Sequence, residues 1–373
     1  MDFTKQVVVI NPMSSCRPTG LGVAGEGLLN YFPECRDRFS DKIYRIINDR
    51  IKSGLLRIVF RQMATEFFAW RHRRKLLICS THQGALLRHG CSVVFIHDFT
   101  TLRRPFQNRA QVMGFLFLLP RIAMNATVLV AISNHAREEL RRYLPGVNQK
   151  KVHVIPSISP RLERFKKGGD DWQARLKKKR FLFVGANFLH KKLDVAIQAV
   201  IELSKKGLNP GLDIVGVPES LWEKSFGFKF ADLKQFGIVA KTYVSDEDLE
   251  KLYSEATALL FLSECEGLGF PPLEAMRKNC PVLCNDTPEL RDTCGEAAIF
   301  VDITQPGAVA GVLEKILLGN LSGELNGKII LGQEQVAKFE RQNIAPKWNG
   351  VFHDLAGALP GQPGDCLTVS RND

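Results

Sequence analysis

Short apolar runs alternate along this chain with longer segments whose apolar positions recur at helical spacing. The strand-like runs are 6–10, 76–79, 92–96, 127–132, 152–156, 181–184, 212–215, 258–262 and 281–284. Short apolar runs bounded by polar or glycine-containing loops are typical of strands buried on both faces of a parallel sheet. Because such strands alternate here with amphipathic helices, the pattern predicts an α/β fold made of doubly wound units.

The stretch 258–286 contains the strongest candidate site in the chain. An apolar run is followed by a loop with Gly267 and Gly269, then by a proline-initiated helix and a second apolar run. Backbone N–H groups of such a loop and helix start converge on an anion, most often a phosphate. Glu266 and Glu274 flank the loop. Carboxylates repel phosphate, so we expect them to accept hydrogen bonds from sugar or ribose hydroxyls, which suits a nucleotide-sugar.

This stretch resembles the E-x7-E segment of the group 1 retaining glycosyltransferases, whose usual form is S-x-x-E-G-F-G-x-P-x-x-E-A-M. The matching residues are Ser263, Glu266, Gly267, Leu268, Gly269, Phe270, Pro271, Pro272, Glu274, Ala275 and Met276. The resemblance implies the GT-B fold, in which two Rossmann-like domains face a cleft. It also implies that Glu274 holds the donor ribose and Glu266 the donor sugar.

Two features of the first half match the same family. The loop with Gly20 and Gly22 lies where the family has G-I-G-R-Y, although Val23 and Ala24 replace the Arg-Tyr pair. His97 follows an apolar run and resembles the histidine of the family's V-x-x-H-D-L segment. The resemblance implies that His97 reaches the reacting sugar.

In the second half, Gly185 and the residues His190 and Lys191 resemble the family's V-G-x-x-x-x-R-K-N segment. Cations at a helix start oppose the helix dipole, which is better tolerated where an anion binds. The resemblance implies that Lys191 contacts the donor diphosphate. Catalytic roles are thus implied for His97, Lys191 and Glu266. Donor binding is implied for Gly20, Gly22, Gly185, His190, Lys191, Glu266, Gly267, Leu268, Gly269, Phe270 and Glu274.

With 373 residues the chain is long enough for two domains. We expect a Rossmann-like acceptor-side domain over 1–165 and a nucleotide-sugar-binding domain over 176–335. A polar linker is predicted over 166–179, a helix that crosses back to the first domain over 336–356, and a disordered tail over 357–373.

The charge and cysteine content of the chain limit the classes of partner and cofactor that it is expected to bind. The formal net charge of +12 leaves nucleic acid, an anionic membrane and anionic small molecules open. No nucleic-acid-binding motif accompanies the charge, so we expect no nucleic-acid partner. Nine cysteines without a C-x-x-C pair favour reduced thiols in a cytosolic protein over a metal site. No D-x-D motif lies at the end of a comparable strand, and the GT-B resemblance implies no essential metal and no cofactor besides the nucleotide-sugar substrate.

The segment 41–75 is basic, with large apolar residues among its cations. Two interpretations stay open: an interfacial surface for an anionic membrane or lipid-linked acceptor, and a solvated helix face packed on its own domain. The apolar stretch 112–119 is predicted to be a core segment. No apolar run approaches the length of a membrane span, and the N-terminus lacks the features of a signal peptide.

The resemblance implies a metal-independent hexosyltransferase, and the composition favours a cytoplasmic protein, with peripheral attachment to the inner membrane face as an option. A retaining enzyme of this family would move a mannose- or rhamnose-type sugar to a glycan or lipid-linked saccharide in polysaccharide assembly. Two alternatives remain. One is a catalytically degraded relative kept as a binding or scaffold protein. The other is a GT-B enzyme of different chemistry, such as a nucleotide-sugar epimerase or a phosphorylase.

Overall fold

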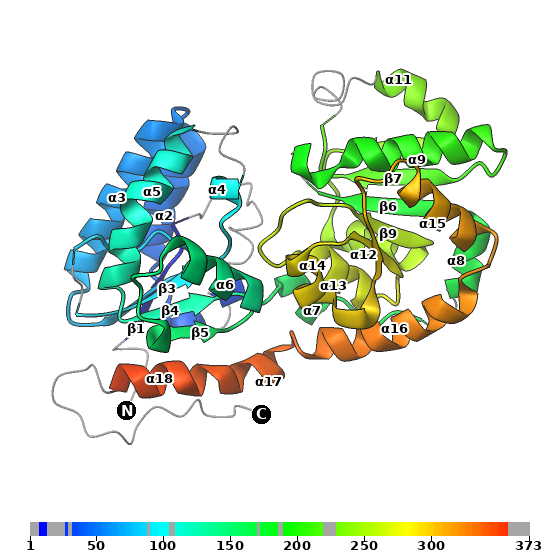
Figure 1. Cartoon of the computed structure of the whole chain (residues 1–373). Coiled ribbons are helices and arrows are strands. Elements are labelled where there is room, and N and C mark those ends of the chain that lie inside the picture. Colours follow the sequence, from blue (N-terminus) through cyan, green and yellow to red (C-terminus); the bar gives the residue numbers. More distant parts are fainter. Residues whose placement is uncertain are drawn as a thin grey trace. The chain divides into compact units, whose positions relative to one another are not determined.

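The computed structural model describes residues 7–12, 27–28, 32–87, 90–103, 109–169, 172–185, 189–218 and 229–356. It divides into two compact units. Unit 1 comprises Met1–Pro160 and Phe339–Asp373, and unit 2 comprises Arg161–Lys338. Each unit has a parallel sheet with helices packed against it (Figure 1). The loop with Gly20 and Gly22 and the tail 357–373 lie outside the described residues, so those predictions are not tested here.

The described sheet of unit 1 has five parallel strands that lie side by side in sequence order. These are β1 (Val7–Ile10), β2 (Leu76–Cys79), β3 (Cys91–Ile96), β4 (Val128–Ala131) and β5 (Val152–Val154). Every residue of β1 to β4 is buried. Burial on both faces explains why these strands are continuous apolar runs in the sequence.

Helices cover both faces of this sheet. One face packs against α2 (Arg38–Arg50), α3 (Gly54–Arg71), α5 (Arg109–Asn125) and α6 (Asn134–Tyr143), with the short α4 (Thr100–Arg103) beside α5. Right-handed crossovers that always step in the same direction place their helices on one face. The other face receives α18 (Trp348–Ala356), where the Trp348 ring centroid lies 5.9 Å from that of Phe95.

Two predictions about helices in unit 1 need correction. The stretch 112–119 is half core, because Phe115 and Leu119 are buried while Leu116 and Phe117 are exposed. The predicted helix over 336–356 is broken. Helix α16 (Ser322–Ala337) ends two residues into this range, and α17 (Arg341–Ile344) and α18 follow as separate pieces.

The described sheet of unit 2 has six parallel strands in the order β11-β10-β9-β6-β7-β8. The strands are β6 (Arg180–Val184), β7 (Gly211–Val215), β8 (Ile238–Lys241), β9 (Ala258–Phe261), β10 (Val282–Asn285) and β11 (Ile299–Val301). The chain runs outward from β6 to β8, then returns to continue on the other side from β9. This is the doubly wound order, and its topological switch point lies between β6 and β9.

The helices of unit 2 also lie on both sheet faces. Helices α9 (Leu193–Lys205) and α15 (Ala308–Leu317) share one hydrophobic core with the sheet. Helices α12 (Asp246–Glu255) and α13 (Phe270–Arg277) contact the sheet, and α14 (Pro288–Cys294) packs beside α13. Pro271 and Pro272 occupy the first turn of α13, so the predicted proline-initiated helix is confirmed. The short α11 (Phe230–Leu233) precedes β8.

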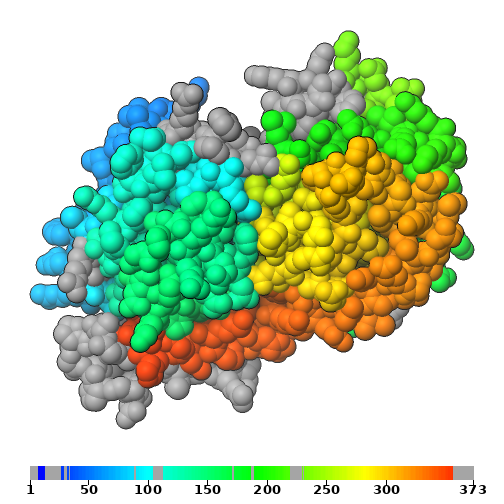
Figure 2. Space-filling view, viewed as in Figure 1, coloured from blue at the N-terminus to red at the C-terminus, as the bar shows by residue number. Residues whose placement is uncertain are grey.

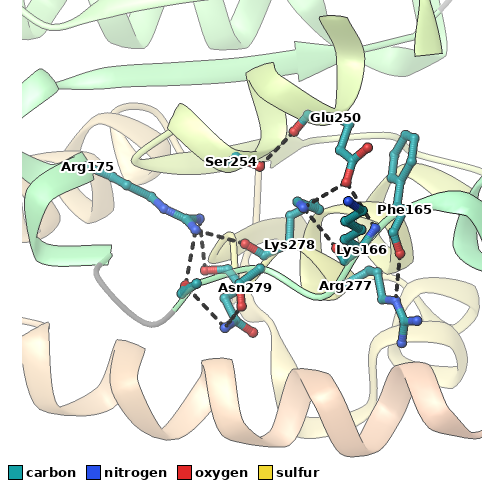
Figure 3. A network of polar contacts seen from close by, with 10 residues as sticks. Phe165, Lys166, Arg175, Glu250, Ser254, Arg277, Lys278 and Asn279 are labelled. Atoms are coloured by element: carbon teal, nitrogen blue, oxygen red, sulfur yellow. Dashed lines mark hydrogen bonds and ion pairs between the residues drawn. The ribbon is translucent and has the colours of Figure 1, made fainter. Parts of the chain in front are cut away.

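The stretch 166–179, predicted as a linker, is instead part of unit 2. It follows α7 (Pro160–Arg164) and contains α8 (Trp172–Lys178). The buried Arg175 donates from its guanidinium to the backbone carbonyls of Lys278, at 2.9 Å, and Asn279, at 3.1 Å (Figure 3). These carbonyls directly follow α13, where a helix leaves acceptors without intrahelical partners.

Further contacts hold the same stretch. Lys278 donates from Nζ to the carbonyl of Lys166 at 2.8 Å and pairs with Glu250 at 2.9 Å. Arg277 donates from Nε to the carbonyl of Phe165 at 3.1 Å (Figure 3). Hydrogen bonds therefore hold this polar stretch against the end of α13, so it is not a solvated linker.

Candidate active site

Two loops meet at the switch point of unit 2. The loop after β6 ends in a short 3-10 helix, Leu189–Lys191, and the loop after β9 covers 262–269. The backbone N–H of Glu264 donates to the carbonyl of His190 at 2.8 Å, and the Ser263 hydroxyl lies 3.4 Å from the same oxygen. Because β6 and β9 are parallel neighbours, their carboxyl ends lie at one edge of the sheet, where open α/β sheets bind ligands.

The structure brings the predicted Lys191 and Glu266 into direct contact. Lys191 Nζ forms an ion pair with Glu266 Oε1, and the two side chains are only 17% and 11% exposed. The same Nζ lies 5.4 Å from the ring centroid of Phe261. Partial burial makes this pair stronger than one on an open surface.

A second pair extends the arrangement. Lys192 Nζ lies 3.2 Å from Glu264 Oε1. The cations that precede α9 are therefore balanced by carboxylates from the loop after β9. The sequence indicated that these cations are better tolerated where an anion binds, and in the structure Glu264 and Glu266 pair with them. Glu264 was missed in the sequence because nothing there shows that its loop folds against Lys192.

The end of β10 and helix α14 position the loop after β9. Glu289, a buried residue of α14, accepts a hydrogen bond from the backbone N–H of Glu266 at 3.2 Å. Asn285 donates from Nδ2 to the carbonyl of Ser263 at 3.1 Å, and Thr293 donates to the carbonyl of Leu268 at 2.5 Å. Sequence reasoning missed these residues, although their place after the next strand of the sheet was a usable signal.

Gly269 directly precedes α13 and has a φ of +77°. A Cβ at this position would lie 3.2 Å from Cε1 of Phe261 and 3.5 Å from a methyl carbon of Leu290. The left-handed backbone and the crowding both favour glycine here. Leu268 is buried, and Phe270 begins α13.

We expect Gly269→Ala to lower the free energy of unfolding by about 1–2 kcal/mol, because an L side chain is strained in the left-handed region. Urea denaturation measures this change. Gly311→Ala is the matched control, because Gly311 lies within α15 with open space where a Cβ would be. That substitution should be neutral or stabilising. Equal stability changes in both variants would contradict the strain at Gly269.

Glu274 lies on α13 and is 1% exposed. Its Oε2 accepts a hydrogen bond from the Tyr253 hydroxyl at 3.0 Å, and its Oε1 lies 3.8 Å from Nη1 of Arg161. Burial, and then the neighbouring Glu274, raise the pKa of Tyr253, which keeps the phenol protonated as a donor. Arg161 also donates from Nε to Asp246 at 2.8 Å. The structure thus places Glu274 within an internal network of unit 2.

His97 follows β3 in unit 1 and is buried. Its Nε2 lies 2.7 Å from the carbonyl oxygen of Ser80. A carbonyl can only accept, so Nε2 donates and the neutral ring keeps Nδ1 as an acceptor. Burial lowers the pKa of His97, although the Ser80 bond and Asp98 oppose this shift. The imidazole is therefore neutral at pH 7.

A cavity of about 100 Å³ lies in unit 1 and includes His82, which follows β2. Its lining residues are Ile58, Arg61, Gln62, His82, Gln83, Thr101, Gly114, Phe115, Leu118, Leu119 and Ile122. Burial lowers the pKa of His82 to about 4, against the raising effect of Asp98. The sequence offered no motif for this histidine beyond its position after a strand.

Gly185 follows β6, and a Cβ there would lie 3.4 Å from the Phe183 ring and 3.9 Å from Cδ of Lys191. Within the described ranges, no group of three or more His, Cys, Asp and Glu residues is arranged to hold a metal ion. The expectation that no metal or cofactor is needed stays a prediction. Among the helices that the structure describes, none combines the length and apolar content needed to span a membrane.

Residues 168–330 match the family model described as "Glycosyl transferases group 1". The chain is 28% identical over 231 residues to the O-antigen chain mannosyltransferase RfbU of Salmonella typhimurium, a match that covers 61% of each chain. It is also 28% identical over 249 residues to the serotype-specific mannosyltransferase WbdA of Escherichia coli, covering 61% of this chain and 30% of WbdA. The matches thus span less than two thirds of these relatives.

Solved structures share the fold. Sucrose-phosphate synthase from Thermosynechococcus elongatus superposes with a TM-score of 0.70 at 15% identity, over 95% of this chain and all of that structure. Anabaena Alr3699/HepE, solved in complex with UDP, gives 0.68 at 12% identity, over 94% and 100%. These structures have the GT-B fold, as the sequence resemblance predicted. Residues 168–330 therefore match the group 1 glycosyltransferase family, and the chain as a whole has the GT-B fold.

Proposed function

We propose that this protein is a retaining glycosyltransferase that uses a nucleoside-diphosphate-sugar as donor. The observation that carries the proposal is the Lys191–Glu266 pair at the switch point of unit 2. A cation and a carboxylate side by side match the two halves of such a donor, one anionic and one rich in hydroxyls. The match of residues 168–330 to the group 1 family supports this assignment.

In the proposed reaction, the donor replaces the internal ion pair. The diphosphate binds the ammonium group of Lys191, and a sugar hydroxyl donates a hydrogen bond to Glu266 in its place. The bond between the anomeric carbon and the phosphate oxygen breaks, and the acceptor oxygen bonds to the same face of that carbon. The acceptor proton leaves with the nucleoside diphosphate. Lys191 stabilises the charge that develops on the departing phosphate oxygen.

The role of His97 toward the donor sugar stays a prediction. A neutral imidazole whose Nε2 donates to Ser80 has Nδ1 as its acceptor, which suits a sugar hydroxyl as partner. The chemistry assigned to His97 is therefore to accept a hydrogen bond and to carry no charge.

We further propose a mannose- or rhamnose-type donor and a glycan or lipid-linked saccharide acceptor in polysaccharide assembly. The named relatives, an O-antigen chain mannosyltransferase and serotype-specific mannosyltransferases, support this choice. We place the protein in the cytoplasm, attached to an anionic membrane surface through the segment 41–75. The described cysteines are buried and form no disulfide, which suits a reducing compartment.

The test is a donor screen followed by a transfer assay. Thermal shift with GDP-mannose, dTDP-rhamnose and UDP-glucose should show one donor that stabilises the protein, by roughly 2.7 kcal/mol at 100 times its Kd. NMR of the product formed with that donor should show the donor's anomeric configuration. Donor binding without transfer to any acceptor would support the scaffold alternative, and conversion of the donor alone would support an epimerase.

We expect Glu274→Gln to weaken nucleoside diphosphate binding by about tenfold or more, because a neutral amide accepts ribose hydroxyls less strongly than a carboxylate. Isothermal calorimetry with the free nucleoside diphosphate measures this change. Tyr253→Phe is the control, since it removes the donor at 3.0 Å from Glu274 without removing the carboxylate. Unchanged affinity in a folded Glu274→Gln protein would leave Glu274 with only its structural contacts.

A further inference from the structure

Helix α3 buries Phe68 and Ile58 but exposes most of its other large apolar residues, while two of its polar residues are buried. Arg61 and Thr65 are buried, and the Thr65 hydroxyl lies 2.8 Å from the hydroxyl of the buried Tyr44. The outward apolar side chains are 44–65% exposed: Leu55, Leu56, Val59, Phe60, Met63, Phe67 and Trp70. Leu56, Phe60, Met63, Phe67 and Trp70 follow each other at three- and four-residue spacing, so they form one stripe along the helix.

Helix α5 adds a second stripe beside the first. Met113, Leu116, Phe117 and Met124 are 51–66% exposed and also recur at helical spacing. The two helices touch at Gly114, where a Cβ would lie 3.5 Å from Ile58. In Figure 1 they run alongside each other, and in Figure 2 the light-blue side chains of the α3 region project along the edge of unit 1. We call these exposed residues of α3 and α5 the α3–α5 surface.

Cations flank this surface. Apart from the buried Arg61, the stretch 50–75 contains seven arginines and lysines: Arg50, Lys52, Arg57, Arg71, Arg73, Arg74 and Lys75. Its one acidic residue, Glu66, accepts a hydrogen bond from the backbone N–H of Leu86 at 2.6 Å, so its charge is directed into unit 1. The Arg73 guanidinium lies 5.6 Å from the ring centroid of Trp70. A cation thus lies against an aromatic side chain at the edge of the α3–α5 surface, and we call the flanking cations its cationic rim.

We propose that the α3–α5 surface inserts into the interfacial region of an anionic lipid bilayer. Monomeric proteins rarely expose apolar patches of this extent unless the patch binds a partner or a membrane. Apolar side chains with a cationic rim match acyl chains beneath anionic headgroups. A second copy of this chain would instead bring two cationic rims together, which like-charge repulsion disfavours. The inference deepens the membrane contact proposed above, because it names the inserting side chains and adds α5.

The test measures binding of the full chain to vesicles of phosphatidylcholine with and without phosphatidylglycerol. We expect binding to the anionic vesicles that weakens with rising salt but persists in part at 1 M NaCl, because inserted apolar side chains are not screened. In vesicles with brominated acyl chains, part of the tryptophan fluorescence should be quenched. Trp70→Phe should remove that part of the quenching.

Three variants separate the contributions. The fourfold glutamine variant should lower the partition coefficient between water and vesicle at least about a hundredfold. It combines Phe60→Gln, Met63→Gln, Phe67→Gln and Trp70→Gln. The fourfold serine variant should lower the partition coefficient about tenfold or more and flatten its salt dependence. It combines Arg71→Ser, Arg73→Ser, Arg74→Ser and Lys75→Ser. The control combines Leu318→Gln and Ile330→Gln, which are 57% and 64% exposed in unit 2, and should bind as the original chain does.

Equal binding to neutral and anionic vesicles would overturn the proposal, and so would unchanged binding of the fourfold glutamine variant. A dimer in sedimentation equilibrium that the same variant dissociates, without vesicle binding, would assign the surface to self-association instead. The vesicle assay contains no nucleotide, so its failure is distinct from a failure of the donor screen. Donor affinity should be the same in all three variants, because the Lys191–Glu266 pair lies in unit 2.

Discussion

Lys191→Met is expected to lower kcat by roughly ten- to a hundredfold, and by more than it weakens donor binding. One charge-assisted hydrogen bond contributes about 1.5–3 kcal/mol, which corresponds to that range of rates. The negative charge on the leaving phosphate oxygen grows as the anomeric bond breaks, so the ammonium group stabilises the transition state more than the bound donor. Single-turnover kinetics with the identified donor, alongside calorimetric donor affinities, measure both quantities.

The ion pair in the structure sharpens this expectation. Methionine at position 191 leaves Glu266 charged and without its ammonium partner, close to where the donor diphosphate is proposed to bind. Repulsion should then weaken donor binding in the single variant. Adding Glu266→Gln removes that repulsion, so the double variant should regain donor affinity but not turnover. Such coupling is what a double-mutant cycle on contacting residues detects.

Lys192→Met is the matched control, because Lys192 precedes the same helix and also pairs with a glutamate, Glu264, at 3.2 Å. A general loss of positive charge at the start of α9 would lower turnover similarly in both variants. A specific diphosphate contact would affect only the Lys191 variant strongly. Full turnover in Lys191→Met with a competent donor and acceptor would remove Lys191 from the proposed mechanism.

Arg175→Leu should lower the free energy of unfolding of unit 2 by about 2–5 kcal/mol. The guanidinium donates to the carbonyls of Lys278 and Asn279, at 2.9 Å and 3.1 Å. Leucine keeps much of the volume but leaves these buried acceptors without their donor, at about 1–3 kcal/mol for each. Urea unfolding should show a lower midpoint, and hydrogen exchange should show faster opening of peptides that cover α13.

Lys178→Leu is the control for this stability effect. Lys178 lies on the same helix α8, but its side chain is 50% exposed and its ion pair with Glu255 is on the surface. Such surface changes are usually within about 0.5 kcal/mol. A similar small effect of Arg175→Leu would mean that water or another donor satisfies the carbonyls at the end of α13.

The sequence predicted the switch-point strands well because burial on both faces imposes continuous apolar runs. It also predicted α13, since proline in the first turn and the preceding glycine are local signals. It could not predict which anion balances Lys191, because Glu266 lies 75 residues away and only the fold brings them together. The linker prediction failed for a related reason. A polar stretch is predicted to lie in solvent when nothing in the sequence shows that Arg175 donates to carbonyls about a hundred residues away.

The basic segment 41–75 shows another limit of sequence reasoning. Helix α3 mixes apolar and polar residues on both faces, so periodicity alone does not decide which face is inside. The structure decides it, because Thr65 bonds to the buried Tyr44 and the Phe60–Trp70 side is left outside. The stretch 112–119 was misassigned as core in the same way, because an apolar run on a helix necessarily faces both inward and outward.

The position of α18 has a consequence for biosynthesis. The sheet of unit 1 is complete once residues 1–160 have been made, but Trp348, which packs against Phe95, comes almost two hundred residues later. At about 5–20 residues per second, the ribosome needs roughly ten to forty seconds to synthesise that interval. During this time unit 2 can fold as a continuous segment, whereas the sheet face around Phe95 in unit 1 still lacks α18. We therefore expect the nascent N-terminal half to expose the apolar surface around Phe95 until α18 has been made, which would make it a substrate for chaperones.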